Sequence, residues 1–175
     1  MPRPDAAEPR PEVTDYLDQL GALALASRLR RLLGRLTRDG SRVYAELDIE
    51  FEVRWFPVLH LLDRCGARPV TEIARALGLT HPAVVQVTGD LLDRGLLSST
   101  QHETDRRRRW LTLTSRGRRL VARLSPIWDA FEAAGRAVAT EGDSDLLAAI
   151  TAAEAALERR SLFDRISDQL EQELR

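Results

Sequence analysis

The middle of the chain contains a pattern that few folds accommodate: two short amphipathic helices, followed by two strands around a run of arginines. The first helix is predicted over 70–77 and ends at Gly78, and the second follows Thr80 and continues to about Arg94. Thr80 is a favourable N-cap, and Pro82 suits the first helical turn, where its missing N–H costs little. Two helices joined by a short turn that contains glycine are typical of a helix-turn-helix.

The segment after these helices predicts a β-hairpin. Apolar and polar residues alternate over 110–113, a second strand is expected over 96–100, and the loop between them contains four arginines at 106–109. A hairpin with a charged tip beside a helix-turn-helix is a wing. We therefore expect a mostly α fold with a small β-wing, in which a winged helix-turn-helix occupies about 54–114.

Amphipathic helices are predicted on both sides of this module. The N-terminal helix is expected over about 15–37, with its end at Asp39-Gly40, and the C-terminal helices over about 115–174. Their apolar faces are larger than a winged helix can cover, and burying one leucine is worth about 1.5–3 kcal/mol. We interpret them as N- and C-terminal dimerisation helices; the alternative is a monomer that folds its arms back.

The remaining organisation is simple. Residues 1–13 are polar and rich in proline, which predicts a disordered lead, and 14–175 are read as a single domain. The chain has no apolar run of about 20 residues and no apolar signal core near its N-terminus, so we expect a soluble cytoplasmic protein without a membrane partner. A single cysteine, Cys65, excludes an internal disulfide.

Charge is distributed unevenly along the chain. Residues 68–123 contain 11 arginines and 5 acidic residues, a net charge of +6, whereas 124–175 contain 5 arginines and 11 acidic residues, a net charge of −6. The middle third is therefore the candidate anion-binding region. The sequence contains no nucleophile–base pairing, no paired carboxylates and no phosphate-binding glycine loop, so an enzyme is not expected.

These features together predict contacts with double-stranded DNA. Affinity would come from the wing arginines Arg106, Arg107 and Arg108, because each neutralised phosphate releases counterions; the alternative is a merely solvated basic loop. Specificity requires base contacts from the exposed face of the second helix. The candidates on and just before that helix are Thr80, His81, Pro82, Ala83, Val85 and Gln86.

The order of elements and two stretches of sequence resemble the MarR (multiple antibiotic resistance regulator) family of winged-helix transcription factors. The stretches are VTEIARALGLTHPAVVQVTGDLLDRGLL and ETDRRRRWLTLTSRG, and the second contains the Asp-x-Arg pair Asp105 and Arg107. The N-terminal helices also resemble the regulator half of chains that fuse this module to an N-acetyltransferase domain. We expect this chain to be too short to contain that second domain. The resemblance covers roughly 15–160.

This resemblance implies a homodimer whose two winged helices bind a pseudo-palindromic DNA site. It also implies a small-molecule or oxidant signal that changes the spacing of these two winged helices. It also implies that Asp105 pairs with Arg107 and stabilises the wing. The family often has arginine at the end of the first wing strand, where this chain has Ser99, so one phosphate or base contact is in doubt. The predicted function is a homodimeric, sequence-specific DNA-binding transcriptional regulator that acts as a repressor and is modulated by a small ligand; the alternative is a ligand-binding or protein-interaction module that does not bind DNA.

The sequence also offers candidate residues for a pocket that binds a small effector. Aromatic walls beside a cationic group suit an aromatic acid. The candidate lining residues are Tyr44, Arg54, Trp55, His60 and Trp128; the alternative is that both tryptophans simply belong to the core. Cys65 is either an oxidant sensor or an inert small apolar residue. The histidines and Cys65 show no metal-ligand spacing, and neither a metal nor a cofactor is expected.

Overall fold

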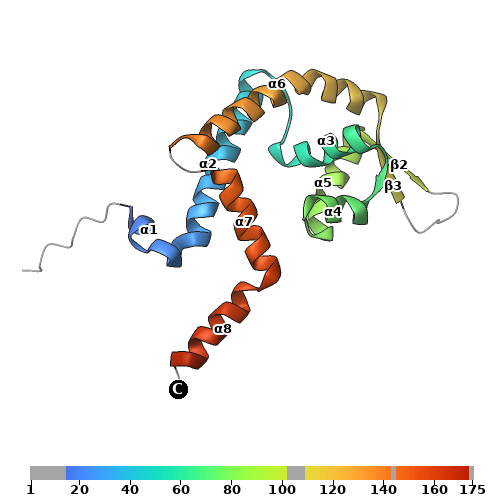
Figure 1. The fold of residues 1–175 in the computed structure, drawn as a ribbon. Helices are drawn as coiled ribbons and strands as arrows, with labels where there is room; N and C mark the ends of the chain where they lie inside the picture. Colours follow the sequence, from blue (N-terminus) through green and yellow to red (C-terminus); the bar gives the residue numbers. More distant parts are fainter. Residues whose placement is uncertain (1–14, 102–108, 143–144, 174–175) are drawn as a thin grey trace, which may run out of the picture. The chain divides into compact units, whose positions relative to one another are not determined.

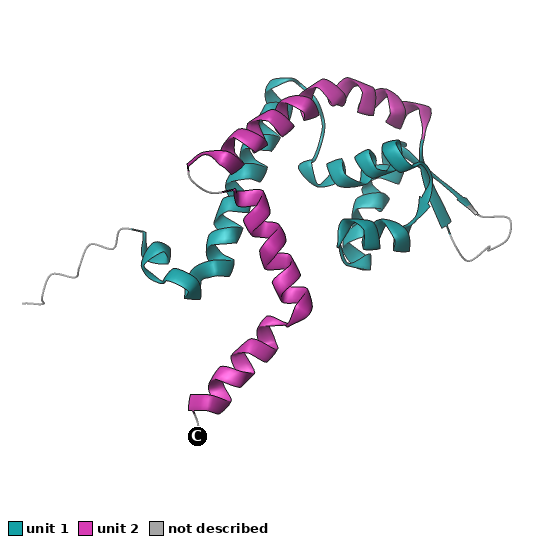
Figure 2. Ribbon diagram, viewed as in Figure 1, with its two compact units in different colours: residues 1–113 teal, residues 114–175 magenta. Residues whose placement is uncertain are grey.

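The computed structural model describes residues 15–101, 109–142 and 145–173. The chain divides into two compact units, residues 1–113 and 114–175 (Figure 2). Each unit is considered by itself.

The N-terminal unit begins with helix α1 (Tyr16–Gln19), a 3-10 turn η1 (Gly21–Ala24) and the long helix α2 (Leu25–Glu46). The single helix predicted over 15–37 is therefore wrong at its start. Gly21 adopts a φ of +52°, which interrupts the helix, and the Asp15 side chain makes no capping hydrogen bond. Instead, the carboxylate of Asp15 accepts two hydrogen bonds from Nη1 of Arg31, at 2.7 and 2.9 Å.

The predicted end of this helix at Asp39-Gly40 is also wrong, because α2 continues through both residues to Glu46. A glycine inside a helix costs only about 1 kcal/mol relative to alanine, which packing can offset. Gly40 is buried, and Tyr44, one turn later, is also buried. The residues from Ser41 to Glu46 thus form the last part of α2.

The winged module has the predicted order of elements, shown together in Figure 1. Its helices are η2 (Val53–Trp55), α3 (Phe56–Cys65), α4 (Val70–Leu77) and α5 (His81–Asp93). Gly66 ends α3 with a φ of +74°, and Gly95 follows α5 with a φ of +65°. These are backbone conformations that side-chain-bearing residues rarely adopt, which explains why glycine ends the helix at both positions.

A three-stranded antiparallel sheet completes the module. Strands β2 (Leu97–Gln101) and β3 (Arg109–Leu113) form the predicted hairpin, with Leu97 opposite Leu113 and Gln101 opposite Arg109. A third strand, β1 (Arg68–Pro69), pairs with the other edge of β3. Two residues are too few to show an alternating pattern, so the sequence did not predict β1.

The core of the module lies between α3, α4, α5 and the sheet. The core consists of almost completely buried apolar side chains, namely Trp55, Val58, Leu59, Leu62, Ile73, Val84, Leu91, Leu97, Leu111 and Leu113. The buried hydroxyl of Thr88 donates to the backbone carbonyl of Val84 at 2.8 Å, so it leaves no unsatisfied polar group. Every element of the winged module is therefore held by one apolar core.

The C-terminal unit consists of α6 (Ser115–Thr140), α7 (Leu146–Arg159) and α8 (Leu162–Glu173). Thr114 caps α6 by accepting a hydrogen bond from the N–H of Gly117 at 3.0 Å, and Asp145 caps α7 in the same way. The helical region predicted over about 115–174 thus contains three helices, and the last two are separated at 160–161.

The interruption has a local cause at Ser161. Its hydroxyl accepts a hydrogen bond from the N–H of Asp164 at 3.1 Å and donates to the Asp164 carboxylate at 2.6 Å. A serine followed three residues later by an acidic residue is a helix-start signal, so α8 begins anew after Ser161. Arg160, the C-cap of α7, is extended.

Candidate nucleic-acid interface

Helices α4 and α5 are joined by a tight turn at Gly78. Gly78 has a φ of +62° and a ψ of +26°, the left-handed conformation that glycine adopts without strain. The N–H of Leu79 donates to the carbonyl of Ala74 at 3.0 Å, which closes the end of α4. Thr80 then begins α5 by accepting a hydrogen bond from the N–H of Ala83 at 3.4 Å. The predicted helix-turn-helix is confirmed together with its N-cap.

The two faces of α5 differ sharply. One face contributes Val84, Val87, Thr88 and Leu91 to the core. The opposite face presents the predicted contact residues at or near the start of the helix. Thr80, His81, Pro82, Val85 and Gln86 are exposed, and Ala83 is half-buried. The structure thus brings all six onto one accessible surface, which we call the α5 reading face.

The start of α5 also suits an anion. Only one of its first N–H groups is bonded to the Thr80 side chain, and Pro82 carries no N–H. The remaining N–H groups of a first helical turn point out of the helix, where they and the helix dipole attract phosphate oxygens. This end of α5 therefore combines backbone donors with side chains that can contact bases.

The wing is described only in part. Asp105, Arg106, Arg107 and Arg108 lie outside the described residues. The strands that carry them are described, and Gln101 and Arg109 form the last pair before that loop. Ser99, where the family often has arginine, is exposed on β2 opposite Leu111.

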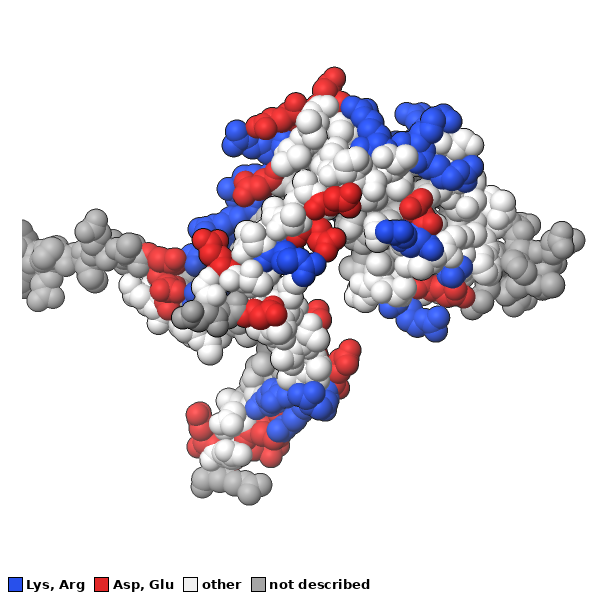
Figure 3. Space-filling model, turned by 45° about the horizontal axis from the view of Figure 1, so that its top comes forward, with Lys and Arg blue, Asp and Glu red and all other residues white. Residues whose placement is uncertain are grey.

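An ion-pair network beside the α5 reading face was not predicted. Nη2 of Arg54 donates to the carboxylate of Asp90 on α5 at 2.6 Å, and its Nε donates to Glu52 at 2.7 Å. The hydrogen bond to Glu52 is the largest effect that raises the pKa of the Arg54 guanidinium, against partial desolvation. On the face drawn in Figure 3, basic and acidic side chains occur together over this module. The Arg54–Asp90 partners are 36 residues apart, so no local sequence signal could have joined them.

The residues predicted to line an effector pocket lie in different surroundings. Tyr44 and Trp55 are buried, Arg54 is held by two carboxylates, and His60 on α3 is half-buried with its ring 5.3 Å from that of Phe56. Trp128 belongs to α6 in the C-terminal unit. The burial of Trp55 agrees with the alternative in which it is core, and the five-residue pocket stays a prediction.

A groove of about 500 Å³ lies elsewhere in the N-terminal unit, on η1 and the first half of α2. It is lined by leucines and arginines, namely Leu25, Arg28, Leu29, Arg31, Leu32 and Arg35, together with Gly21 and Ala22. None of the five predicted pocket residues belongs to it.

Within 15–101, 109–142 and 145–173, no three histidine, cysteine or acidic side chains gather as metal ligands would. In that part of the chain, no helix combines the length and apolar character needed to cross a membrane. Cys65, at the end of α3, is exposed and unpaired as a thiol.

The fold and the α5 reading face define a winged helix-turn-helix protein of the kind that binds DNA. A model described as the MarR family matches residues 49–108, which span η2 to the first part of the wing. The chain belongs to the MarR family of transcriptional regulators. The resemblance expected from the sequence is thereby confirmed.

Solved structures support the same assignment. The chain is 30% identical to a transcriptional repressor, CouR, in a structure bound to a 23-mer DNA duplex; the match covers 82% of this chain and 99% of CouR, with a TM-score of 0.64. It is 26% identical to a MarR family regulator from Neisseria meningitidis, over 89% of this chain and 99% of that one, with a TM-score of 0.57. BpsR from Bordetella bronchiseptica, whose DNA binding is regulated by 6-hydroxynicotinic acid, shares the fold at 23% identity over 77% of this chain and 92% of that one, with a TM-score of 0.62. No curated protein sequence is significantly similar to the chain.

Proposed function

We propose that the protein is a homodimeric, sequence-specific DNA-binding repressor of transcription that acts in the cytoplasm and responds to a small ligand. The observation that carries this proposal is the α5 reading face, an exposed surface on a helix whose other side is anchored in the core. Family membership and the DNA-bound repressor to which the chain is similar support it.

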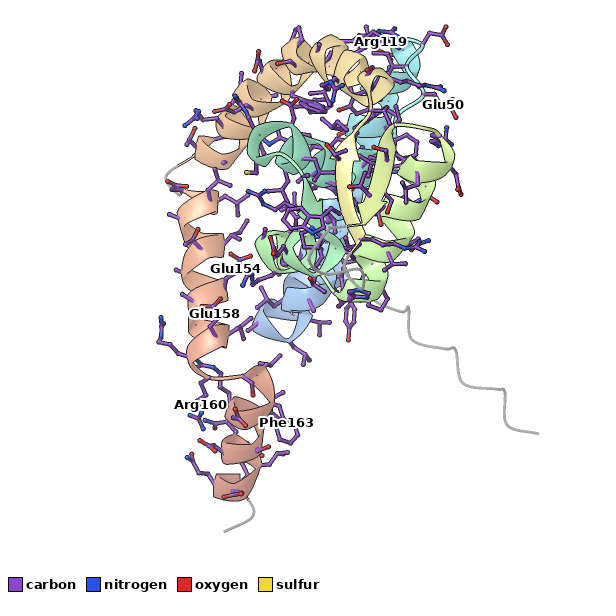
Figure 4. All side chains as sticks on the ribbon, turned by 90° about the vertical axis from the view of Figure 1, so that its right-hand side faces the viewer. Glu50, Arg119, Glu154, Glu158, Arg160 and Phe163 are labelled. Carbon is purple, nitrogen blue, oxygen red and sulfur yellow. The ribbon has the colours of Figure 1, made fainter. Side chains whose placement is uncertain are left out.

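Exposed apolar side chains support the homodimer. On α2, Leu25, Leu29, Leu33 and Leu36 recur on one face of the helix and are 49–64% exposed. On α8, Phe163 is 76% exposed and projects from the helix in Figure 4. Monomeric proteins rarely expose contiguous apolar stripes of this kind, and a second copy of the chain covers them by symmetry.

The wing supplies affinity in this proposal. Arg106, Arg107 and Arg108 contact the DNA backbone or a narrow minor groove, and Asp105 holds Arg107 in place. The paired strands β2 and β3 support this role, because they flank the arginine-rich segment in the sequence and β2 packs against α5. Such contacts are independent of sequence, so they make binding strongly dependent on salt.

A structural neighbour supports a small-molecule ligand in this proposal. The structural neighbour from Bordetella bronchiseptica is described as regulated by 6-hydroxynicotinic acid, an aromatic acid. Aromatic acids are also the chemical class that the predicted set of Tyr44, Arg54, Trp55, His60 and Trp128 would suit.

The test is selection of genomic DNA fragments by the purified full-length protein, followed by titration of the best fragment at several salt concentrations. A dimeric regulator should select a palindrome whose half-sites are about 10 bp apart and should bind it with a steep salt slope. Weak, uniform binding without any enriched sequence would contradict the proposal.

Gln86→Ala is expected to reduce the preference for the selected operator over random DNA by about 1–3 kcal/mol, because glutamine bonds adenine at two positions. Gel-shift titrations of both duplexes measure this preference. Gln169→Ala, the same change at an exposed position of α8, serves as the control and should leave it unchanged. If Gln86→Ala has no effect either, the base contacts lie elsewhere on α5.

A further inference from the structure

Two arginine–carboxylate contacts join the C-terminal half of α5 to the segment before α3, and they run in opposite directions. Arg54, from that segment, donates to Asp90 on α5 at 2.6 Å. Arg94, the C-cap residue of α5, donates in return to the carboxylate of Glu50. Figure 4 shows Glu50 on the loop that follows α2. We call these four residues the α5 clamp.

An aromatic cluster continues the clamp towards α2. The guanidinium carbon of Arg94 lies 4.6 Å from the ring centroid of Trp55, which is 1% exposed. Trp55 makes an edge contact with Phe51, with 5.7 Å between centroids, and Phe51 is 4.6 Å from Tyr44 on α2. Contacts therefore run without a gap from the end of α2 to the end of α5.

The geometry of α5 explains why its orientation needs such contacts. Apolar packing on its buried face is not directional, so it tolerates small rotations that hydrogen bonds do not. The nine residue steps from His81 to Asp90 span about 13.5 Å along the helix. A tilt of about 10° at Asp90 would therefore displace the start of the α5 reading face by about 2 Å, which is enough to break a hydrogen bond to a base.

We propose that Glu50, Arg54, Asp90 and Arg94 are positioning residues that hold α5 at the angle required for base contact. This inference rests on the proposed DNA-binding function. An acidic side chain on a helix that faces DNA repels phosphates, so its charge alone would weaken DNA binding. The clamp gives Asp90 a different role, which is to hold α5 through Arg54. The clamp and simple electrostatics therefore predict different outcomes for the operator preference when that charge is removed.

The decisive variant is Asp90→Asn in the full-length protein. Dissociation constants are measured for the selected operator and for a random duplex of equal length. The clamp predicts that affinity for random DNA stays equal or rises, while the preference for the operator falls about 3- to 10-fold. If both affinities rise equally and the preference is unchanged, Asp90 acts only through its charge and the inference is overturned.

A matched control and a double-variant cycle test the pairing itself. Asp93→Asn makes the same chemical change on the same helix, at an exposed residue for which the described part of the chain shows no ion pair, and should leave the operator preference intact. Arg54→Gln should reduce that preference as Asp90→Asn does. The double variant should lose no more than either single variant, because both remove one interaction. Additive losses would overturn the inference.

The ratio of operator affinity to random-DNA affinity also distinguishes a variant that mispositions α5 from a variant that folds poorly. A smaller folded fraction weakens both affinities by the same factor and leaves their ratio unchanged. If the wild-type protein does not discriminate between the duplexes, the proposed function and the clamp are overturned together. If the wild-type protein discriminates and all clamp variants discriminate equally well, the clamp alone is overturned.

Discussion

Replacement of Leu29 and Leu33 by glutamate is expected to convert the protein from a dimer to a monomer. Both leucines belong to the exposed stripe of α2, at 49% and 64% exposure. At about 1.5 kcal/mol for each buried leucine, the four leucines of a symmetric dimer contribute about 6 kcal/mol. The dissociation constant of the dimer should therefore rise roughly 10⁴-fold, as measured by sedimentation equilibrium.

The control for this prediction lies on the same helix. Ser27 and Ser41 are exposed on the side of α2 away from the leucine stripe, so Ser27→Glu with Ser41→Glu adds the same charges without touching it. This double variant should remain dimeric. Circular dichroism should show the same helical content for both variants. A wild-type protein that sediments as a monomer would contradict the proposed dimer.

The second large effect concerns the stability of the winged module. Leu91→Ala should lower the free energy of unfolding by about 2–5 kcal/mol, because Leu91 is fully buried and its truncation leaves a cavity. Denaturant titration at one fixed protein concentration measures this change, since dimerisation makes stability depend on concentration.

Val85→Ala provides the comparison for Leu91→Ala. Val85 lies on the same helix but is 47% exposed, so its truncation should change stability by less than about 0.5 kcal/mol. Equal effects of the two variants would mean that α5 is not anchored through Leu91.

The winged module could be predicted because its signals are local. The left-handed turn at Gly78, the Thr80 cap and the stop at Gly95 each depend on a few neighbouring residues. The inward face of α5 followed from helical periodicity, which also assigned the α5 reading face. The helix start at Ser161 is local too, although apolar periodicity alone does not mark it.

Other features depend on contacts between distant residues. The helix continues through Asp39-Gly40 because the surroundings of Gly40 bury it, and local propensity is too weak to prevent this. The β1 strand exists only because β3 offers it an edge.

The sequence by itself thus determined the order of the elements, the helix-turn-helix and the exposed face of α5, because caps, glycine turns and periodicity act within a few residues. Only the tertiary structure decided the α5 clamp and the burial of Trp55. Arg54 and Asp90 are 36 residues apart, and Arg94 and Glu50 are 44 apart. Such partners meet only when the core has brought their elements together, and no local pattern encodes that meeting.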